Sequence, residues 1–132
     1  MTKIGSVTAA LLLAAAVLTL TPGCSSQPYE PTVSVPPGLT LEQIRRAIIQ
    51  AGVDNDWQMQ EVDDRTFRGL HDRYAQEAII LIEYSATGCT IRFSGHGGAG
   101  RPGRAGLSIG TYNDWVAQLS ADISGRLQQE LR

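Results

Sequence analysis

A short apolar run near the N terminus divides this chain before its folding can be considered. Residues 9–20 are twelve residues of which only Thr19 is polar, and Lys3, the sole lysine of the chain, precedes them. A helix that spans a membrane needs about 20 apolar residues, so this run has the length of a cleaved signal peptide. We expect residues 1–23 to be removed, and a permanent spanning helix is the alternative.

The residues that follow this run resemble the lipobox of bacterial lipoproteins. Gly23 and Cys24 match the small residue and the cysteine of that motif, whereas Thr21 stands where the family prefers Leu, Val or Ile. The resemblance implies that Cys24 becomes a lipid-bearing N terminus, and two or more acyl chains anchor a protein stably. Ser25, in place of aspartate, implies the periplasmic face of an outer membrane. An ordinary secretory peptide with a chance cysteine is the alternative.

Cysteine usage agrees with lipid at this position. The chain has two cysteines, so lipid on Cys24 leaves Cys89 without a partner. Cys89 lies in an apolar, strand-like stretch, where a buried cysteine packs as a small hydrophobic residue. If Cys24 were not modified, it could instead form a disulfide bond with Cys89.

The charge of the remaining chain limits its partners. Residues 24–132 contain ten arginines, no lysine and thirteen acidic residues, so they are mildly acidic. Nucleic-acid binding needs clustered positive charge, and we therefore expect no nucleic-acid partner. A chain of this length can bury enough surface to fold around one core without disulfide bonds.

Composition divides residues 24–132 into a tether and a domain. Residues 24–39 are rich in Ser and Pro, with prolines at positions 28, 31, 36 and 37. Such a segment favours an extended, semi-rigid tether that would lift a domain off the bilayer. The folded domain is therefore expected over residues 40–132.

Two helices are predicted in this domain. Thr40 and Gln43 have the spacing of a capping box, and apolar residues follow at helical intervals until Gly52, which predicts a helix over residues 41–51. The last helix is expected to begin at Thr111 with Asp114 as its capping carboxylate. One apolar stripe runs along it, formed by Tyr112, Trp115, Val116, Leu119, Ile123 and Leu127.

Between these helices the sequence predicts four strands, over residues 57–62, 66–71, 77–84 and 89–94. Short links join them, which is typical of an antiparallel meander. Residues 77–84 are apolar on both faces, so we expect helices or loops to cover part of each face. The predicted fold is a two-layer α+β domain, ordered helix, four-stranded antiparallel meander, helix.

The end of the domain resembles small uncharacterised proteobacterial lipoproteins. Those proteins have an I-x-Y motif before the last strand and Y-N-x-W-x-x-x-L-x-x-x-I in the final helix. The matching residues here are Glu83 and Tyr84, then Tyr112, Asn113, Asp114, Trp115, Leu119 and Ile123. The similarity extends over most of residues 40–131. Its motifs are packing residues, so the resemblance implies no activity.

Two glycine motifs point to enzymes but lack the required context. Residues 95–100 match G-x-G-x-x-G, yet Arg101, Pro102 and Gly103 follow where a dinucleotide site needs a helix. Residues 106–110 match the nucleophile elbow G-x-S-x-G, yet no histidine follows Ser108. A small periplasmic hydrolase that uses Ser108 or Cys89 stays as the alternative function.

We expect no metal site or cofactor. His71 and His96, the only histidines, fall on different predicted elements without a short ligand spacing, and we expect them at the surface. The aspartates at positions 54, 56, 63 and 64 suit turns better than a calcium loop, because a strand interrupts the ligand pattern. The aromatic residues of the final helix are expected in the core.

The sequence therefore predicts a membrane-anchored envelope lipoprotein with a non-enzymatic binding or structural domain. Its expected partners are the membrane, through the lipid anchor, and another component of the envelope. Arg101 and Arg104, on a glycine-rich loop, are the candidate contacts to an anionic partner.

Overall fold

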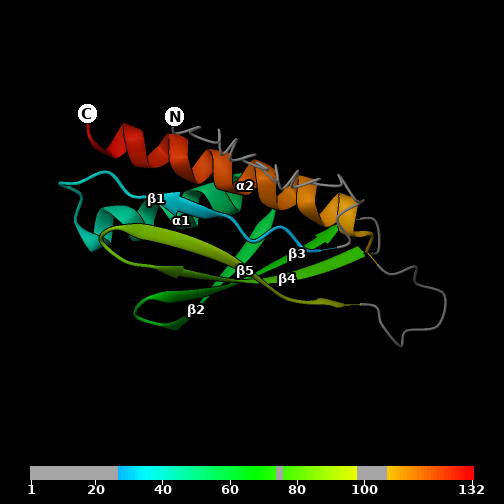
Figure 1. The fold of residues 1–132 in the computed structure, drawn as a ribbon. Coiled ribbons are helices and arrows are strands. Elements are labelled where there is room, and N and C mark those ends of the chain that lie inside the picture. Colours follow the sequence, from blue (N-terminus) through cyan, green and yellow to red (C-terminus); the bar gives the residue numbers. More distant parts are fainter. Residues whose placement is uncertain (1–26, 74–75, 98–106) are drawn as a thin grey trace, which may run out of the picture.

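A computed structural model describes residues 27–73, 76–97 and 107–132 of the chain (Figure 1). In chain order its elements are β1 (Thr32–Ser34), α1 (Leu41–Asp54), β2 (Trp57–Asp63), β3 (Thr66–Arg73), β4 (Gln76–Tyr84), β5 (Gly88–Gly97) and α2 (Ile109–Glu130). The strands form one antiparallel sheet in the order β1-β5-β4-β3-β2. Neither helix of this described part is long and apolar enough to cross a membrane. The predicted leader and Cys24 lie outside the described residues.

The predicted two-layer α+β class is confirmed, and β2 to β5 form the expected antiparallel meander. The count of four strands is wrong, because β1 adds a fifth strand beside β5, with Val33 paired to Cys89. Val33 and Val35 are buried, so part of the predicted tether belongs to the domain. β1 has only three residues, fewer than the run of about 4–8 that reveals a strand in a sequence.

The helices cover a single face of the sheet, which becomes the core (Figure 1). Successive strand residues point to opposite faces, and the buried residues of β4 follow that alternation: Ala78, Ile80, Ile82 and Tyr84. From α2 the buried residues are Tyr112, Val116, Leu119, Ile123 and Leu127. The predicted apolar stripe on this helix is therefore confirmed, except that Trp115 is only partly buried.

Neither helix of the described residues lies over the opposite face of the sheet. Ile79 and Leu81 on this face are half-buried, and their neighbours on β3 are Leu70 and Arg68 respectively. The expectation that helices or loops cover both faces is not met among the described residues, because α1 and α2 pack against each other on the same side. The arginine beside Leu81 makes this face mixed in polarity.

The start of α1 is as predicted, and its end is not. Thr40 Oγ1 accepts a hydrogen bond from the Gln43 N–H at 3.1 Å, and Gln43 Oε1 accepts one from the Thr40 N–H at 2.9 Å. The helix continues beyond Gly52 to its C-cap at Asn55. A Cβ at Gly52 would lie 2.6 Å from Met59 Cγ, so this glycine allows close packing and does not stop the helix.

The final helix begins two residues earlier than expected. Ser108 is its N-cap, and Ser108 Oγ accepts a hydrogen bond from the Thr111 N–H at 3.1 Å. Asp114 is exposed and is not the capping residue. The predicted start at Thr111 is wrong because Ser108 already supplies the cap that a helix needs, with its oxygen three residues before the bonded N–H.

The role of β1 can be tested by two neighbouring substitutions. Val33→Asp should lower the free energy of unfolding by at least about 3 kcal/mol, since it removes a buried apolar side chain and buries a charge. Ser34→Asp, on the exposed side of the same strand, should change it by less than about 0.5 kcal/mol. Urea unfolding followed by circular dichroism measures both. Equal stability of the two variants would contradict the assignment of β1 to the core.

Candidate functional site

A polar cleft opens where α1 ends, beside the end of β3 and the first turns of α2. Its volume is about 340 Å³, within the range of pockets for small ligands. The residues that define its chemistry are Asp54, Asp56, His71, Arg73, Asp114 and Trp115. We call it the His71 cleft.

Contacts between the end of α1 and α2 fix one wall of the His71 cleft. The Asn55 amide Nδ2 donates to Asp122 Oδ2 at 3.0 Å, and Asp54 forms an ion pair with Arg126 of α2. Asp56 follows with a φ of 65°, in the left-handed region that aspartate tolerates better than most residues. The backbone thereby turns from α1 into β2 and leaves the Asp56 side chain at the cleft.

His71 forms the floor of the cleft within an aromatic cluster. Its exposed fraction is only 3%. The imidazole stacks on Trp115 with ring centroids 3.9 Å apart, and meets Trp57 edge to face at 5.0 Å. The predicted surface position of His71 is wrong, because β3 turns this residue to the helix side, directly opposite Trp57 of β2.

The environment of His71 keeps its imidazole neutral. Burial lowers the pKa of His71 from its usual value of 6.5, and Arg73 acts in the same direction, whereas the carboxylates of Asp56 and Asp72 oppose them. Nδ1 is buried and has no hydrogen-bond partner. A buried polar atom without a partner costs about 1–3 kcal/mol and calls for an explanation.

The cleft carries more negative than positive charge. Three aspartates and one arginine line it. Asp56 lies 3.8 Å from Arg73, and Asp54 pairs with Arg126. Asp114 is exposed and forms no hydrogen bond or ion pair with any other residue of the described part. Asp114 is therefore the carboxylate most available to a ligand.

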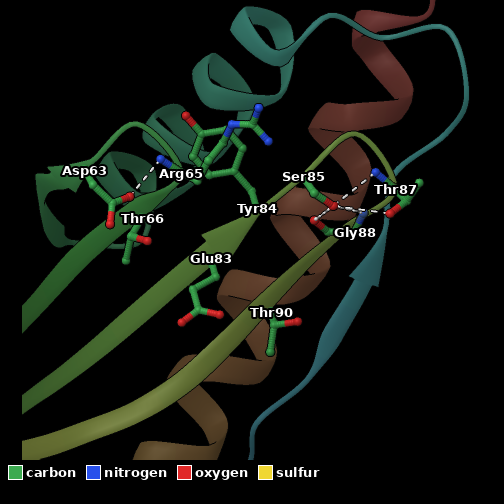
Figure 2. Close-up of a pocket in the computed structure, with 9 residues that line it drawn as sticks. All are labelled: Asp63, Arg65, Thr66, Glu83, Tyr84, Ser85, Thr87, Gly88 and Thr90. Atoms are coloured by element: carbon green, nitrogen blue, oxygen red, sulfur yellow. Dashed lines mark hydrogen bonds between the residues drawn. The ribbon is translucent and has the colours of Figure 1, made fainter.

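A second hollow, of about 540 Å³, lies where the β2–β3 and β4–β5 turns meet (Figure 2). Several of its polar groups form hydrogen bonds within the turns. Asp63 Oδ1 accepts the Arg65 N–H at 2.9 Å, and Ser85 Oγ accepts the Gly88 N–H at 3.3 Å. Figure 2 shows these bonds within the rim. Although this hollow is larger, none of its lining residues has a buried side-chain polar atom without a partner, whereas His71 of the other cleft has one.

The two predicted nucleophiles occupy structural positions. Ser108 Oγ donates to Thr111 Oγ1 at 2.8 Å, in addition to capping α2. Cys89 has no exposed surface, and burial raises the pKa of its thiol to about 12, whereas reactive cysteines are partly exposed thiolates. Neither residue lines the His71 cleft or the hollow of Figure 2.

The sheet brings the two histidines nearer than the sequence indicates. His71 of β3 and His96 of β5 are both register partners of Ala78 of β4, so one strand separates these two backbone positions. Within the described ranges, no three His, Cys, Asp or Glu residues are grouped to hold a metal ion. Arg101 and Arg104 lie outside the described residues.

Sequence reasoning missed the His71 cleft, although one signal was present. A tight hairpin between the strands at residues 57–62 and 66–71 places Trp57 opposite His71, and the structure has this pairing. The stacking of His71 on Trp115 has no such local signal, because the two residues are far apart in the chain.

Comparison with protein-family models, with curated proteins and with solved structures finds no match for this chain. The resemblance to small lipoproteins therefore stays a prediction.

Substitutions at Ser108 separate a capping role from a catalytic one. Ser108→Ala should lower the free energy of unfolding by about 1 kcal/mol, because the helix loses its cap. Ser108→Asp should retain most of the stability, since aspartate is an equally good N-cap. Thermal unfolding of the two variants checks this. Specific labelling of Ser108 in the folded protein by a serine-directed probe would contradict a purely capping role.

The lowered pKa of His71 predicts a loss of stability in acid. The unfolded chain binds this proton more readily than the folded one, so the free energy of unfolding falls as the pH drops below about 6.5 towards the folded pKa. The slope from His71 is at most about 1.4 kcal/mol per pH unit. His71→Phe keeps an aromatic ring and should weaken this dependence in urea unfolding at pH 7 and 5. The same pH dependence in both proteins would contradict it.

Proposed function

We propose that this chain is a membrane-anchored envelope lipoprotein, held by lipid on Cys24, and that its domain is a non-enzymatic binding module. The observation that supports a binding role best is the His71 cleft, where a buried imidazole nitrogen lacks a partner beside an unpaired carboxylate. The apolar leader and Gly23-Cys24 support the proposed address.

The first described residues bind to the domain next to this cleft. The Tyr29 N–H donates to Asn113 Oδ1 at 2.7 Å, and Asn113 Nδ2 donates to the Gln27 carbonyl at 3.5 Å. Asn113 precedes Asp114 in the first turns of α2. The polypeptide therefore enters the domain beside the end of α2 that borders the His71 cleft.

This entry point restricts how far the domain can sit from a lipid anchor. Cys24 lies only three residues before Gln27, and an extended chain covers at most about 3.6 Å per residue. Lipid on Cys24 would then lie within roughly 11 Å of Gln27. Under this proposal residues 24–39 do not lift the domain off the bilayer, as the extended tether predicted from their prolines would, and the His71 cleft lies close to the bilayer.

The alternative of a small hydrolase has no comparable support. Its two nucleophiles are a helix cap and a core thiol of raised pKa. The His71 cleft offers an imidazole, but neither nucleophile lines it. A binding role needs only the groups that the cleft already presents.

The anchor is tested by removing the proposed acylation site. Cys24→Ala should prevent acylation and move the protein out of the membrane fraction, because the protein then carries no acyl chains to insert into the bilayer. Cys89→Ala is the control: it removes the other cysteine and should leave fractionation unchanged. Mass spectrometry of the mature N terminus identifies the lipid. An intact leader on a protein that stays in the cytosol would contradict the proposal.

A further inference from the structure

We propose that the His71 cleft binds the primary ammonium group of a small organic cation, such as a diamine or a lysine side chain. This inference deepens the proposed binding role and does not depend on lipid at Cys24. Its premises are the charge of the cleft, the unpartnered imidazole and the aromatic surface of Trp115.

The sign of the charge selects a cation over an anion. Three aspartates border the cleft against a single arginine. That arginine, Arg73, lies 3.8 Å from Asp56, so an anion would have to compete with a carboxylate for it. Asp114 has no counter-charge within the described residues. An ammonium group would supply that counter-charge and up to three hydrogen bonds.

An acidic lining alone is common on protein surfaces, so the buried imidazole is the decisive second observation. His71 is 97% buried, by its exposed fraction of 3%, and borders the cleft with Nδ1 lacking a partner. A neutral imidazole has one nitrogen that accepts a hydrogen bond, and it does not repel a cation. Stacking on Trp115 holds the imidazole ring in place.

The geometry favours an organic ammonium group over a bare metal ion. No three metal-binding side chains of the described part are grouped as a metal site. Trp115 is partly exposed in the cleft, and an indole attracts ammonium groups within about 6 Å of its ring. The volume of about 340 Å³ admits an amine with a short alkyl chain.

The proposal is tested by titrating the processed protein, purified in mild detergent, with 1,5-diaminopentane and with Nα-acetyl-lysine amide. Nα,Nε-diacetyl-lysine amide is the matched neutral ligand, and calcium is the matched metal. The chain has two tryptophans, so two indole N–H signals report on binding in an NMR spectrum. We expect saturable shifts of the Trp115 signal with one or both amines, and none with the neutral ligand or calcium. The amine that binds identifies the source of the ammonium group.

Two variants test the role of the cleft. Asp114→Asn should weaken amine binding about tenfold, as expected for the loss of one charge-assisted hydrogen bond. Asp64→Asn changes the net charge equally, but it lies in the β2–β3 turn outside the cleft and should leave the affinity unchanged. Because both side chains are exposed, both variants should keep the wild-type melting temperature.

Several results would overturn the proposal. These are no saturable binding at millimolar amine, equal weakening by both variants, or binding of calcium in preference to the amines. Each of them leaves the lipid assignment untouched, since that depends on fractionation and mass spectrometry of Cys24. Conversely, a chain without lipid at Cys24 that still binds amines would refute the anchor alone.

Discussion

Burial of one face of the sheet beneath two helices is the interaction on which the rest of the structure depends. Alternate residues of β4 are fully or almost fully buried, and α2 supplies a continuous apolar stripe against them. A strand next to β4 must therefore turn the same set of its side chains towards the helices. This requirement brings His71 of β3, a polar residue, into the core beside Trp57 and Trp115.

The cleft follows from where this packed layer ends. α1 stops at Asp54 and the chain turns at Asp56, with Asn55 hydrogen-bonded to α2. The backbone passes there from the helical layer into the sheet, between α1 and β2. Polar side chains lie at this connection. His71 distinguishes this connection from an ordinary helix-to-strand turn, because its imidazole is desolvated and Nδ1 has no hydrogen-bond partner. Trp57 Nε1 and Tyr112 Oη are also buried without a partner, but of these three residues only His71 lines the cleft.

The segment that precedes α1 belongs to the sheet, although its composition predicts a tether. Its prolines prevent a helix, as expected, yet β1 pairs with β5 and Val33 packs into the core. Glu30 also accepts a hydrogen bond from the Phe93 N–H at 3.1 Å through its carboxylate. The same residues thus close one edge of the sheet and, under the proposed anchoring, hold the domain close to the bilayer. A short link and a structural strand are compatible, because an extended chain can serve as both.

The sequence by itself determined the elements whose evidence is local. The capping box at Thr40 and the apolar stripe of α2 are set by neighbouring residues, and these predictions are confirmed. Only the tertiary structure decided that β1 joins the sheet, that both helices share one face, and that His71 meets Trp115. Those outcomes depend on contacts between residues far apart in the chain. Such contacts form because the apolar face of the sheet is buried under the helices, and no local sequence pattern indicates them.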